Sequence, residues 1–401
     1  MSLLDELMTD LAPQGVRHCR LDEVAGYSET RVDGSELDRT SFVGVDNLVA
    51  GAGGKVAASY LPNTQRLTAY EVGDVLLGNI RPYLKKVWLA TNSGGCSGDV
   101  LAVRVKGQKK QVLDPAFLYY VLSSGEFFAY NVQHSKGAKM PRGSKDAIMG
   151  YRIPVPPIEA QREIVRILDT FTQLDAELEA ELEARRRQFE HFAGLLLANE
   201  EHALRVRFGD VATIVRGASP RPIQKFITDD PGGAPWIKIG DVPPGGKYIT
   251  RTGQRVTKEG ASKSRRVRPG DFVLSNSMSF GRPYISKIDG YIHDGWLSIS
   301  GFEDSFISDY LYYLLRSAPV QEEFAKRAGA GTVKNLNAEV VRAVEIPMPS
   351  RERQGQIVEL LDRFDALVND LRSGLPAELA ARRKQYAYYQ DKLLTFEERT
   401  A

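Results

Sequence analysis

The chain has 401 residues, 42% of them hydrophobic, which is enough for two or three domains with buried cores. Its net charge of +2 does not indicate nucleic-acid binding by bulk charge, so any basic surface must come from local arrangement. The two cysteines, Cys19 and Cys96, lack CxxC spacing, and no apolar run reaches the roughly 18 residues of a membrane span. The acidic start "MSLLDELMTDLAPQG" is unlike a signal peptide. We therefore expect a reduced, cytoplasmic protein.

The first half, residues 1–152, has the pattern of a small mixed α+β domain. Short β-type runs at residues 42–45, 74–77 and 100–105 alternate with turns rich in glycine and proline. A Leu-Tyr-Tyr triplet in residues 115–122 predicts one short helix.

Two loops of this half combine basic, polar and aromatic residues. They are "NIRPYLKK" (79–86) and "SKGAKMPRGSK" (135–145). Such side chains can contact phosphates and base edges, although a single basic loop is more often merely solvated. The candidate DNA contacts of this half are Arg81, Tyr83, Lys85, Lys86, Lys136, Lys139, Arg142 and Lys145.

A long helix is predicted in residues 153–200. The proline-rich "IPVPP" precedes apolar residues whose steps alternate between three and four, as in a coiled-coil seam. A helix of about 40 residues would be roughly 60 Å long. The basic run Arg185–Arg187 lies on this helix. We expect it to form a solvated face rather than an electrostatic contact with a partner or a DNA backbone. The predicted seam consists of Ile164, Ile167, Phe171, Leu174, Leu178, Leu182, Phe189, Phe192 and Leu196.

The second half, residues 201–345, repeats this organisation. Runs at 236–239 and 272–274 predict strands, "SDYLYYLL" repeats the tyrosine-bearing helix, and three loops are again basic or polar. The occurrence of such loops at matching places in both halves shifts the balance toward DNA binding. The candidate contacts here are Arg265, Arg266, Asn276, Ser277, Arg282, Tyr284, Lys334 and Asn335.

A second helical region, residues 346–401, follows "IPMPS". The offset between the copies grows from 193 at Gln161 and Gln354 to 197 at Gln188 and Gln385, so the second copy carries four more residues, around "SGLP". Gly374 and Pro376 should break or kink this helix, and Pro376 should restart it from its first turn. Its predicted seam consists of Ile357, Leu360, Phe364, Leu367, Leu371, Leu375, Leu379, Tyr386, Tyr389 and Leu393.

The resulting fold class is mixed α+β with an internal duplication and two long helices. We expect the helices to pack antiparallel as a coiled coil with approximate two-fold symmetry, and the two globular domains to lie at opposite ends.

Motifs for catalysis and metal binding are missing. "GAGGKV" (51–56) lacks the first glycine and the Ser/Thr of a phosphate loop, and "GAGTVK" (329–334) lacks the last glycine of a dinucleotide fingerprint. No HExxH motif occurs, and no Asp/Asn-Pro-Pro-aromatic motif of a base-modifying methyltransferase. We therefore predict no catalytic residue and no metal ligand.

Two segments carry a resemblance to a known family. "PPIEAQREIVRILDTF" followed by "LEARRRQFEHF", and "QIVELLDRFDALVNDLRSGLPAELAARRKQYAYYQDKLLTF", resemble the conserved regions of the specificity subunit of type I restriction–modification enzymes. The resemblance covers the whole chain as target recognition domain, helix, target recognition domain, helix. Ser350 in place of a proline and Gly355 inside the second helix depart from the family pattern.

The resemblance implies a non-catalytic DNA-binding subunit. Each target recognition domain would read one half of a bipartite site in double-stranded DNA. The helices would set the spacer and dock two modification subunits, which would supply S-adenosylmethionine for DNA methylation, so this chain needs no cofactor of its own. Restriction subunits, a translocase and nuclease, are optional partners.

Two alternatives remain open. A scaffold could join two protein partners without touching DNA, although the basic loops argue against it. A stand-alone DNA-modifying enzyme is the other, and the missing cofactor motifs argue against that. The recognised half-sites and the spacer length do not follow from the residues.

Overall fold

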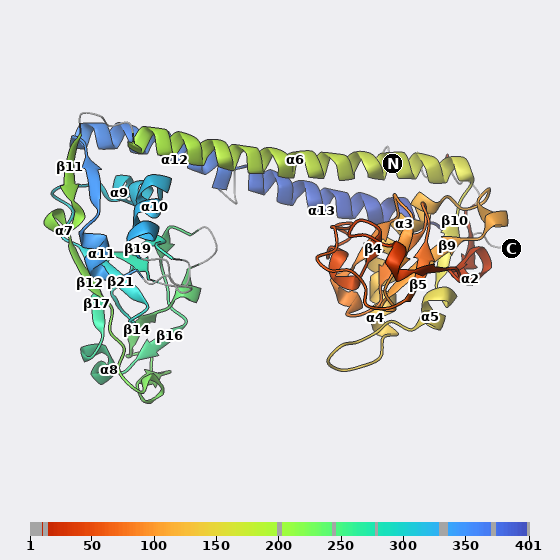
Figure 1. The fold of residues 1–401 in the computed structure, drawn as a ribbon, viewed down its shortest axis with the longest axis horizontal. Helices are drawn as coiled ribbons and strands as arrows, with labels where there is room; N and C mark the ends of the chain where they lie inside the picture. The colour runs from red at the N-terminus through yellow and green to blue at the C-terminus, as the bar shows by residue number, and fades with distance from the viewer. Residues whose placement is uncertain are drawn as a thin grey trace. The chain divides into compact units, whose positions relative to one another are not determined.

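The fold is that of a computed structural model, which describes residues 10, 15–198, 203–242, 246–276, 280–328, 336–369 and 374–398. The chain divides into two compact units (Figure 1). Unit 1 comprises Met1–Glu177 with Ala380–Ala401, and unit 2 comprises Leu178–Leu379. Within the described ranges, no helix combines the length and apolarity that crossing a membrane requires.

Unit 1 contains two four-stranded sheets and a separate antiparallel pair of strands. One sheet has the order β2 (Ala25–Tyr27), β9 (Val100–Val105), β6 (Val75–Gly78), β7 (Val87–Leu89). The other has the order β3 (Arg31–Asp33), β5 (Arg66–Tyr70), β8 (Gly94–Cys96), β4 (Phe42–Val43), and the pair is β1 (Arg17–Arg20) with β10 (Arg152–Val155). The helices of the globular part are α2 (Leu21–Val24), α3 (Pro115–Ser123), α4 (Gly125–Gln133) and α5 (Lys145–Gly150).

Unit 2 contains two five-stranded sheets and the equivalent strand pair. The first sheet has the order β12 (Thr213–Arg216), β21 (Trp296–Ser300), β18 (Phe272–Ser275), β19 (Pro283–Ser286), β15 (Tyr248–Ile249). The second has the order β13 (Ile227–Thr228), β16 (Gln254–Val256), β14 (Ala234–Ile237), β20 (Gly290–Ile292), β17 (Arg265–Val267), and the pair is β11 (Leu204–Arg207) with β22 (Glu345–Met348). Its helices are α7 (Phe208–Val211), α8 (Lys258–Ser262), α9 (Ser308–Arg316), α10 (Ala318–Arg327) and α11 (Ala338–Arg342).

Every strand predicted from the sequence is present, in β4, β6, β9, β14 and β18. The tyrosine-bearing helices are α3 and α9, and both are almost entirely buried. Their apolar side chains belong to the main core cluster of their unit, which fixes each helix against the sheets. The prediction of two mixed α+β halves is confirmed.

Both long helical regions lie where the sequence predicts them, but the first region forms one helix and the second forms two. The first is α6 (Ile158–Ala198), with 41 residues. The second region forms α12 (Arg351–Asn369) and α13 (Leu375–Leu394). Pro376 is the second residue of α13, a first-turn position at which a backbone N–H would have no partner within the helix. A proline therefore removes no helical hydrogen bond there, and the predicted restart is confirmed.

Contacts inside unit 1 give the direction of packing. The ring of Phe171 stacks on Tyr389 with centroids 5.3 Å apart, and four residues further along α6 the Asp175 carboxylate accepts a hydrogen bond from Arg383 Nε at 3.0 Å. The residue number rises along α6 while it falls along α13, so the helices are antiparallel, as expected. In unit 2, Phe192 of α6 contacts Phe364 of α12 at 5.3 Å.

The predicted seam is wrong at several positions. Leu174, Leu360 and Leu367 are exposed, at 42%, 36% and 48% of their surface. The buried stripe instead includes Leu168 and Leu361, both fully buried. Strict three-four alternation assumes that a helix faces only its partner helix, whereas these helices also face a globular core, which widens and rotates the buried stripe.

A buried glutamine fastens each long helix to its globular part. In unit 1, Gln161 Oε1 accepts from the backbone N–H of Asp114 at 2.8 Å, and its Nε2 donates to the carbonyls of Val112 and Pro156, each at 2.7 Å. In unit 2, the fully buried Gln354 makes the matching three bonds. Its partners are the N–H of Ile307 at 2.7 Å and the carbonyls of Ser305 and Pro349 at 2.9 Å each.

A tyrosine completes this connection in both units. Tyr120 of α3 donates to Asp169 of α6 at 2.5 Å, and Tyr313 of α9 donates to Asp362 of α12 at 2.6 Å. The duplication seen in the sequence therefore extends to individual hydrogen bonds.

Candidate nucleic-acid interface

The two basic loops predicted in the first half form one surface. The backbone N–H of Arg81 donates to the carbonyl of Pro141 at 2.7 Å, and the N–H of Gly143 donates to the carbonyl of Asn79 at 3.1 Å. Lys136 and Arg142 exchange two backbone hydrogen bonds of 2.9 Å, which makes the second loop a narrow hairpin. This hairpin is the yellow segment between α4 and α5 that projects from the unit in Figure 1.

The first of these loops is held in an unusual conformation. Arg81 and Lys85 flank the short turn Pro82–Leu84 and both have left-handed backbones, with φ of 53° and 51°. Such φ values are uncommon for residues with a Cβ atom, and they cluster at functional sites. Pro82 is buried under the turn, whereas Tyr83 is 54% exposed. The turn therefore presents Tyr83 and its basic neighbours to solvent.

Two buried asparagines lie beneath this surface. Asn79 and Asn131 are 6% and 2% exposed, and no described residue donates a hydrogen bond to the Oδ1 atom of either. A Cβ atom on Gly143 would lie 2.3 Å from Asn131 Oδ1 and 2.8 Å from Asn79 Oδ1. Only glycine fits here, and its small size lets the hairpin approach the first loop.

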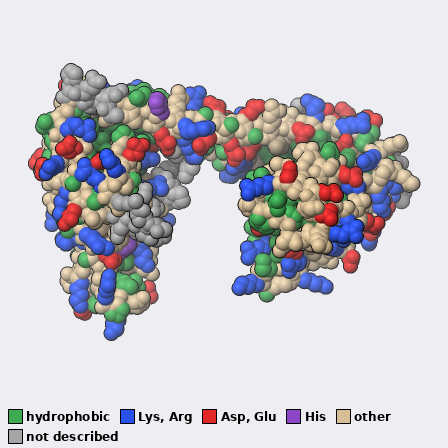
Figure 2. All heavy atoms as spheres, viewed as in Figure 1, with side chains coloured by type: hydrophobic (Ala, Val, Ile, Leu, Met, Phe, Trp, Pro, Cys, Tyr) green, Lys and Arg blue, Asp and Glu red, His purple; other side chains and the backbone are tan. Residues whose placement is uncertain are grey.

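The charged residues of the first surface differ in availability. Lys136, Lys139 and Lys145 are exposed, and Lys and Arg side chains are visible around the projecting hairpin in Figure 2. Arg142 is exposed and pairs with Asp99, Nε to Oδ1 at 2.9 Å. Lys86 is half-buried and donates to the carbonyl of Val45 at 2.7 Å, so it has the weakest claim to a DNA phosphate.

An equivalent junction exists in the second half. Asn276 is the counterpart of Asn79, and its backbone carbonyl accepts a hydrogen bond from the backbone N–H of Leu336 at 2.8 Å. Its side-chain Nδ2 donates to the carbonyl of Asp294, also at 2.8 Å. Each half thus uses an asparagine after a core strand to attach a second loop. Three predicted residues, Ser277, Lys334 and Asn335, lie outside the described residues.

Two of the predicted contacts in the second half have interior positions. Asn276 and Tyr284 are each 4% exposed. Asn276 is occupied by the junction, and the ring of Tyr284 packs edge-on against Trp296 with centroids 5.7 Å apart. We therefore withdraw both from the set of candidate DNA contacts, because their side chains cannot reach a ligand outside the core.

The remaining candidates of this half lie at or near the surface. Arg265 is exposed on β17. The neighbouring Arg266 pairs with Asp289, Nε to Oδ1 at 2.9 Å. Arg282 is half-buried, with its guanidinium 5.6 Å from the ring centre of Tyr284.

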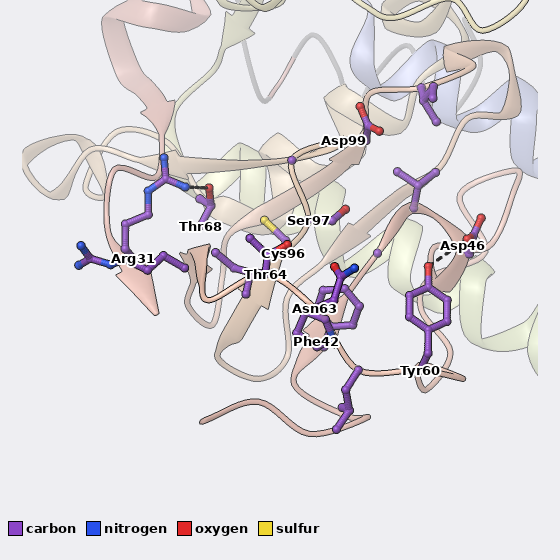
Figure 3. A pocket seen from close by; sticks show the side chains of 18 of the residues that line it. Arg31, Phe42, Asp46, Tyr60, Asn63, Thr64, Thr68, Cys96, Ser97 and Asp99 are labelled. Atoms are coloured by element: carbon purple, nitrogen blue, oxygen red, sulfur yellow. Dashed lines mark hydrogen bonds between the residues drawn. The ribbon is translucent and has the colours of Figure 1, made fainter. Parts of the chain in front are cut away.

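Sequence reasoning missed a pocket in each unit. The pocket of unit 1 has a volume of about 660 Å³ (Figure 3). Arg31, which donates to Thr68 at 2.9 Å, lies on one side of it. On the other side, the Tyr60 hydroxyl donates to Asp46 at 3.3 Å. The lining comes from segments scattered over about a hundred residues, so no local motif signals it.

The pocket of unit 2 has a volume of about 850 Å³. Trp236, Gln254 and His293 are among its lining residues. Burial lowers the pKa of His293, which keeps the imidazole neutral near pH 7. The backbone N–H of Gly295 donates to His293 Nδ1 at 2.9 Å, so the proton of the neutral ring sits on Nε2. The described residues contain no cluster of three or more side chains that could hold a metal ion.

A family model described as "Type I restriction modification DNA specificity domain" matches residues 69–185 and 203–381. The chain is 29% identical over 259 residues to the EcoR124I/EcoR124II specificity subunit of Escherichia coli, covering 61% of this chain and 63% of that protein, which is less than two thirds of its length. It is 30% identical over 301 residues to a putative type I restriction enzyme specificity subunit of Haemophilus influenzae, covering 72% and 74%.

Solved structures have the same fold. A chain from a study of complex assembly and conformational transition of the type I R-M system matches with a TM-score of 0.71 at 20% identity, covering 96% of this chain and 98% of that chain. The HsdS subunit from Thermoanaerobacter tengcongensis matches with a TM-score of 0.51 at 21% identity, covering 96% and 97%.

Proposed function

The chain belongs to the type I restriction–modification DNA specificity family, and on that premise we propose that it directs a modification enzyme to a bipartite DNA site. Residues 1–152 and 201–345 are the target recognition domains in this proposal, and residues 153–200 and 346–401 are the helical regions between and after them. The observation that carries it is the duplicated junction, in which Asn79 and Asn276 each attach a second loop to the loop after a core strand. Two readers built alike can each take one half-site.

The loop residues that lie at or near the surface are the proposed DNA contacts, and the basic ones among them are the proposed phosphate contacts. Phosphate contacts fix the register of a protein on DNA, and each one adds to the salt dependence of binding. Lys334, together with Ser277 and Asn335, stays a prediction from sequence. The described members of the set are Arg81, Tyr83, Lys85, Lys86, Lys136, Lys139, Arg142 and Lys145 in the first domain, and Arg265, Arg266 and Arg282 in the second.

The helices offer two matched docking positions for modification subunits. Leu174 and Leu367 occupy equivalent places in the repeat, and both are exposed although leucine gains by burial. A pair of identical partners would cover a pair of equivalent leucines. We assign S-adenosylmethionine and the methyl-transfer chemistry to those partners, and we place the assembly in the cytoplasm, where it meets DNA. Restriction subunits are further partners in this proposal.

Multivalency explains the two-reader design. Once one domain has bound, the second binds at a high effective concentration, so the specificities of two modest readers multiply. The uninterrupted α6 makes the first helix the stiffer element of the spacer, because α12 and α13 are separate helices.

The test uses the chain assembled with its modification subunits and a duplex carrying the site found by methylation mapping. Arg81→Ala combined with Lys85→Ala should weaken binding. The slope of log affinity against log salt should fall by about one for each phosphate that the variant no longer binds.

The control is Lys110→Ala, which removes an exposed lysine outside the loops and should change neither quantity. Unaltered affinity and slope in the folded Arg81/Lys85 variant would reject the loops as the DNA interface.

A further inference from the structure

The two pockets occupy equivalent positions in the duplicated fold. In unit 1, β4 and β8 are parallel neighbours with Val43 opposite Cys96. In unit 2, β14 and β20 are parallel neighbours with Ile237 opposite Ile292. Each pocket is lined by residues that follow directly after the carboxyl ends of these parallel strands. Carboxyl ends of parallel strands commonly border ligand sites in α/β proteins.

The residues after the strands correspond in pairs. Gly44 and Val45 after β4 correspond to Lys238 and Ile239 after β14. Ser97 after β8 corresponds to His293 after β20.

Both pockets also combine the same kinds of side chain. The aromatic Phe42 on β4 corresponds to Trp236 on β14, and a proline, an amide and an arginine complete each lining. These three come from unrelated segments in the two halves. They are Pro62, Asn63 and Arg31 in unit 1, and Pro220, Gln254 and Arg221 in unit 2.

This combination fits a nucleotide. Partly exposed apolar side chains such as Pro62 and Ile223 suit the face of a base, the amide suits its hydrogen-bonding edge, and an arginine suits a phosphate. In unit 2, no described residue donates to Gln254 Oε1, and the neutral His293 keeps its Nε2 proton, so an acceptor and a donor are present in one pocket. Both volumes lie within the range of roughly 300–1,000 Å³ typical of small-ligand sites.

The pockets are continuous with the proposed DNA surface. Ile80 and Met140, one from each basic loop of unit 1, line the first pocket together with Asp99, the partner of Arg142. In unit 2, the backbone carbonyl of Asp294, another lining residue, accepts from Asn276 at the loop junction. A nucleotide that leaves the stack of a bound duplex would therefore enter a pocket directly beside it.

We propose that each pocket receives one nucleotide unstacked from its half-site and reads the edge of its base, an inference that rests on the proposed function. A concave pocket cannot reach base edges at the floor of a groove in an undistorted duplex, whereas it can enclose an extruded base. Because Ser97 is replaced by His293 and Gly44 by Lys238 at equivalent places, the two pockets select different bases.

The experiment uses the complete complex with modification subunits and its cognate duplex. Each half-site position on both strands is replaced in turn by the fluorescent base 2-aminopurine, which brightens when it unstacks. One position in each half-site should brighten several-fold in addition to any base that a modification subunit extrudes.

Variants of the two pockets control each other. Gln254→Ala should abolish the signal in the second half-site only, and Asn63→Ala should abolish it in the first only, while the signal of a base held by a modification subunit persists. Gln254→Glu, which replaces the neutral amide acceptor by a charged carboxylate, should change the preferred base at one position of the methylated sequence. A variant that binds the site normally yet retains every signal overturns the pocket assignment.

The proposed function and this inference fail in different ways. A wild-type complex that binds cognate and scrambled duplexes equally would refute the proposed function and the inference with it. A complex that is sequence-specific but brightens at no position beyond those that persist in both pocket variants would refute the inference alone.

Discussion

The two halves of the chain are alike where the long helices attach and different where the sheets present their pockets. Gln161 and Gln354 make three equivalent hydrogen bonds each, and Tyr120 and Tyr313 each donate a hydrogen bond to the equivalent aspartate of their long helix. The pocket sheets, in contrast, are extended at opposite edges. β5 beside β8 in unit 1 and its counterpart β17 beside β20 in unit 2 are paired alike, but the sheet of unit 1 continues past β5 to β3, whereas the sheet of unit 2 continues past β14 to β16.

This difference separates two demands on the duplicated fold. In the proposed function the attachment presents two equivalent surfaces to identical partners, which accounts for hydrogen bonds that are repeated in kind. The pocket sheet keeps three equivalent strands and changes the edge at which further strands are added, which allows two recognition surfaces of different chemistry on one plan.

The largest expected effect breaks the attachment. Gln161→Ala removes three hydrogen bonds and leaves buried backbone groups unpaired, which should destabilise unit 1 by roughly 3 kcal/mol or more, and Gln354→Ala should do the same in unit 2. Hydrogen exchange of the core strands measures the two effects separately.

The matched control is Gln173→Ala, since Gln173 is an exposed glutamine on the same helix. If one of the two buried glutamines proved dispensable, the attachments would be alike in geometry only.

A medium effect should separate the two loop junctions. Gly143→Ala places a Cβ atom against the two asparagine oxygens and should cost about 1–3 kcal/mol, displacing the hairpin. Binding to the first half-site should weaken while binding to the second is retained, as measured on duplexes with one half-site scrambled. Gly107→Ala, at a surface glycine with no atom within 4 Å of an added Cβ, provides the control. Equal weakening at both half-sites would contradict independent readers.

The smallest effect concerns pH and exploits the exchange of Ser97 for His293. Burial lowers the folded-state pKa of His293 below the roughly 6.5 of an unfolded histidine, so the unfolded chain takes up a proton that the folded chain refuses. The stability that neutral His293 gives unit 2 is therefore complete above about pH 6.5. It declines as the pH falls from there to the folded pKa.

The melting temperature measures this decline. The difference between wild type and His293→Gln should shift slightly between pH 8 and pH 5, and Ser97→Ala should produce no such shift. A difference that is constant with pH would mean that His293 does not titrate in this range.

Local patterns predicted the elements, and non-local packing decided the rest. Alternating apolar runs placed β9 and the tyrosine-bearing helices, because those signals lie within a few residues. The sequence predicts Tyr284 as a DNA contact because it ends a polar, loop-like stretch that includes Arg282, yet Trp296, on a strand formed later in the chain, buries its ring. The pockets could not be predicted from the sequence for the same reason, because Arg31, Asn63 and Ser97 come together only after the sheet has formed.

Unit 1 is built from the first and the last parts of the chain, which affects how it folds during synthesis. Leu393 and Leu394 belong to the core that Ile164 and Leu168 also form, and the N–H of Val16 donates to the carbonyl of Glu397 at 2.9 Å. The ribosome must therefore translate all of unit 2 before it delivers the residues that close the core of unit 1. At about 5–20 residues per second this interval lasts on the order of tens of seconds. During that time the nascent first unit exposes the apolar surface that α13 will cover, and exposed apolar surface of this kind is what makes incomplete chains prone to aggregate.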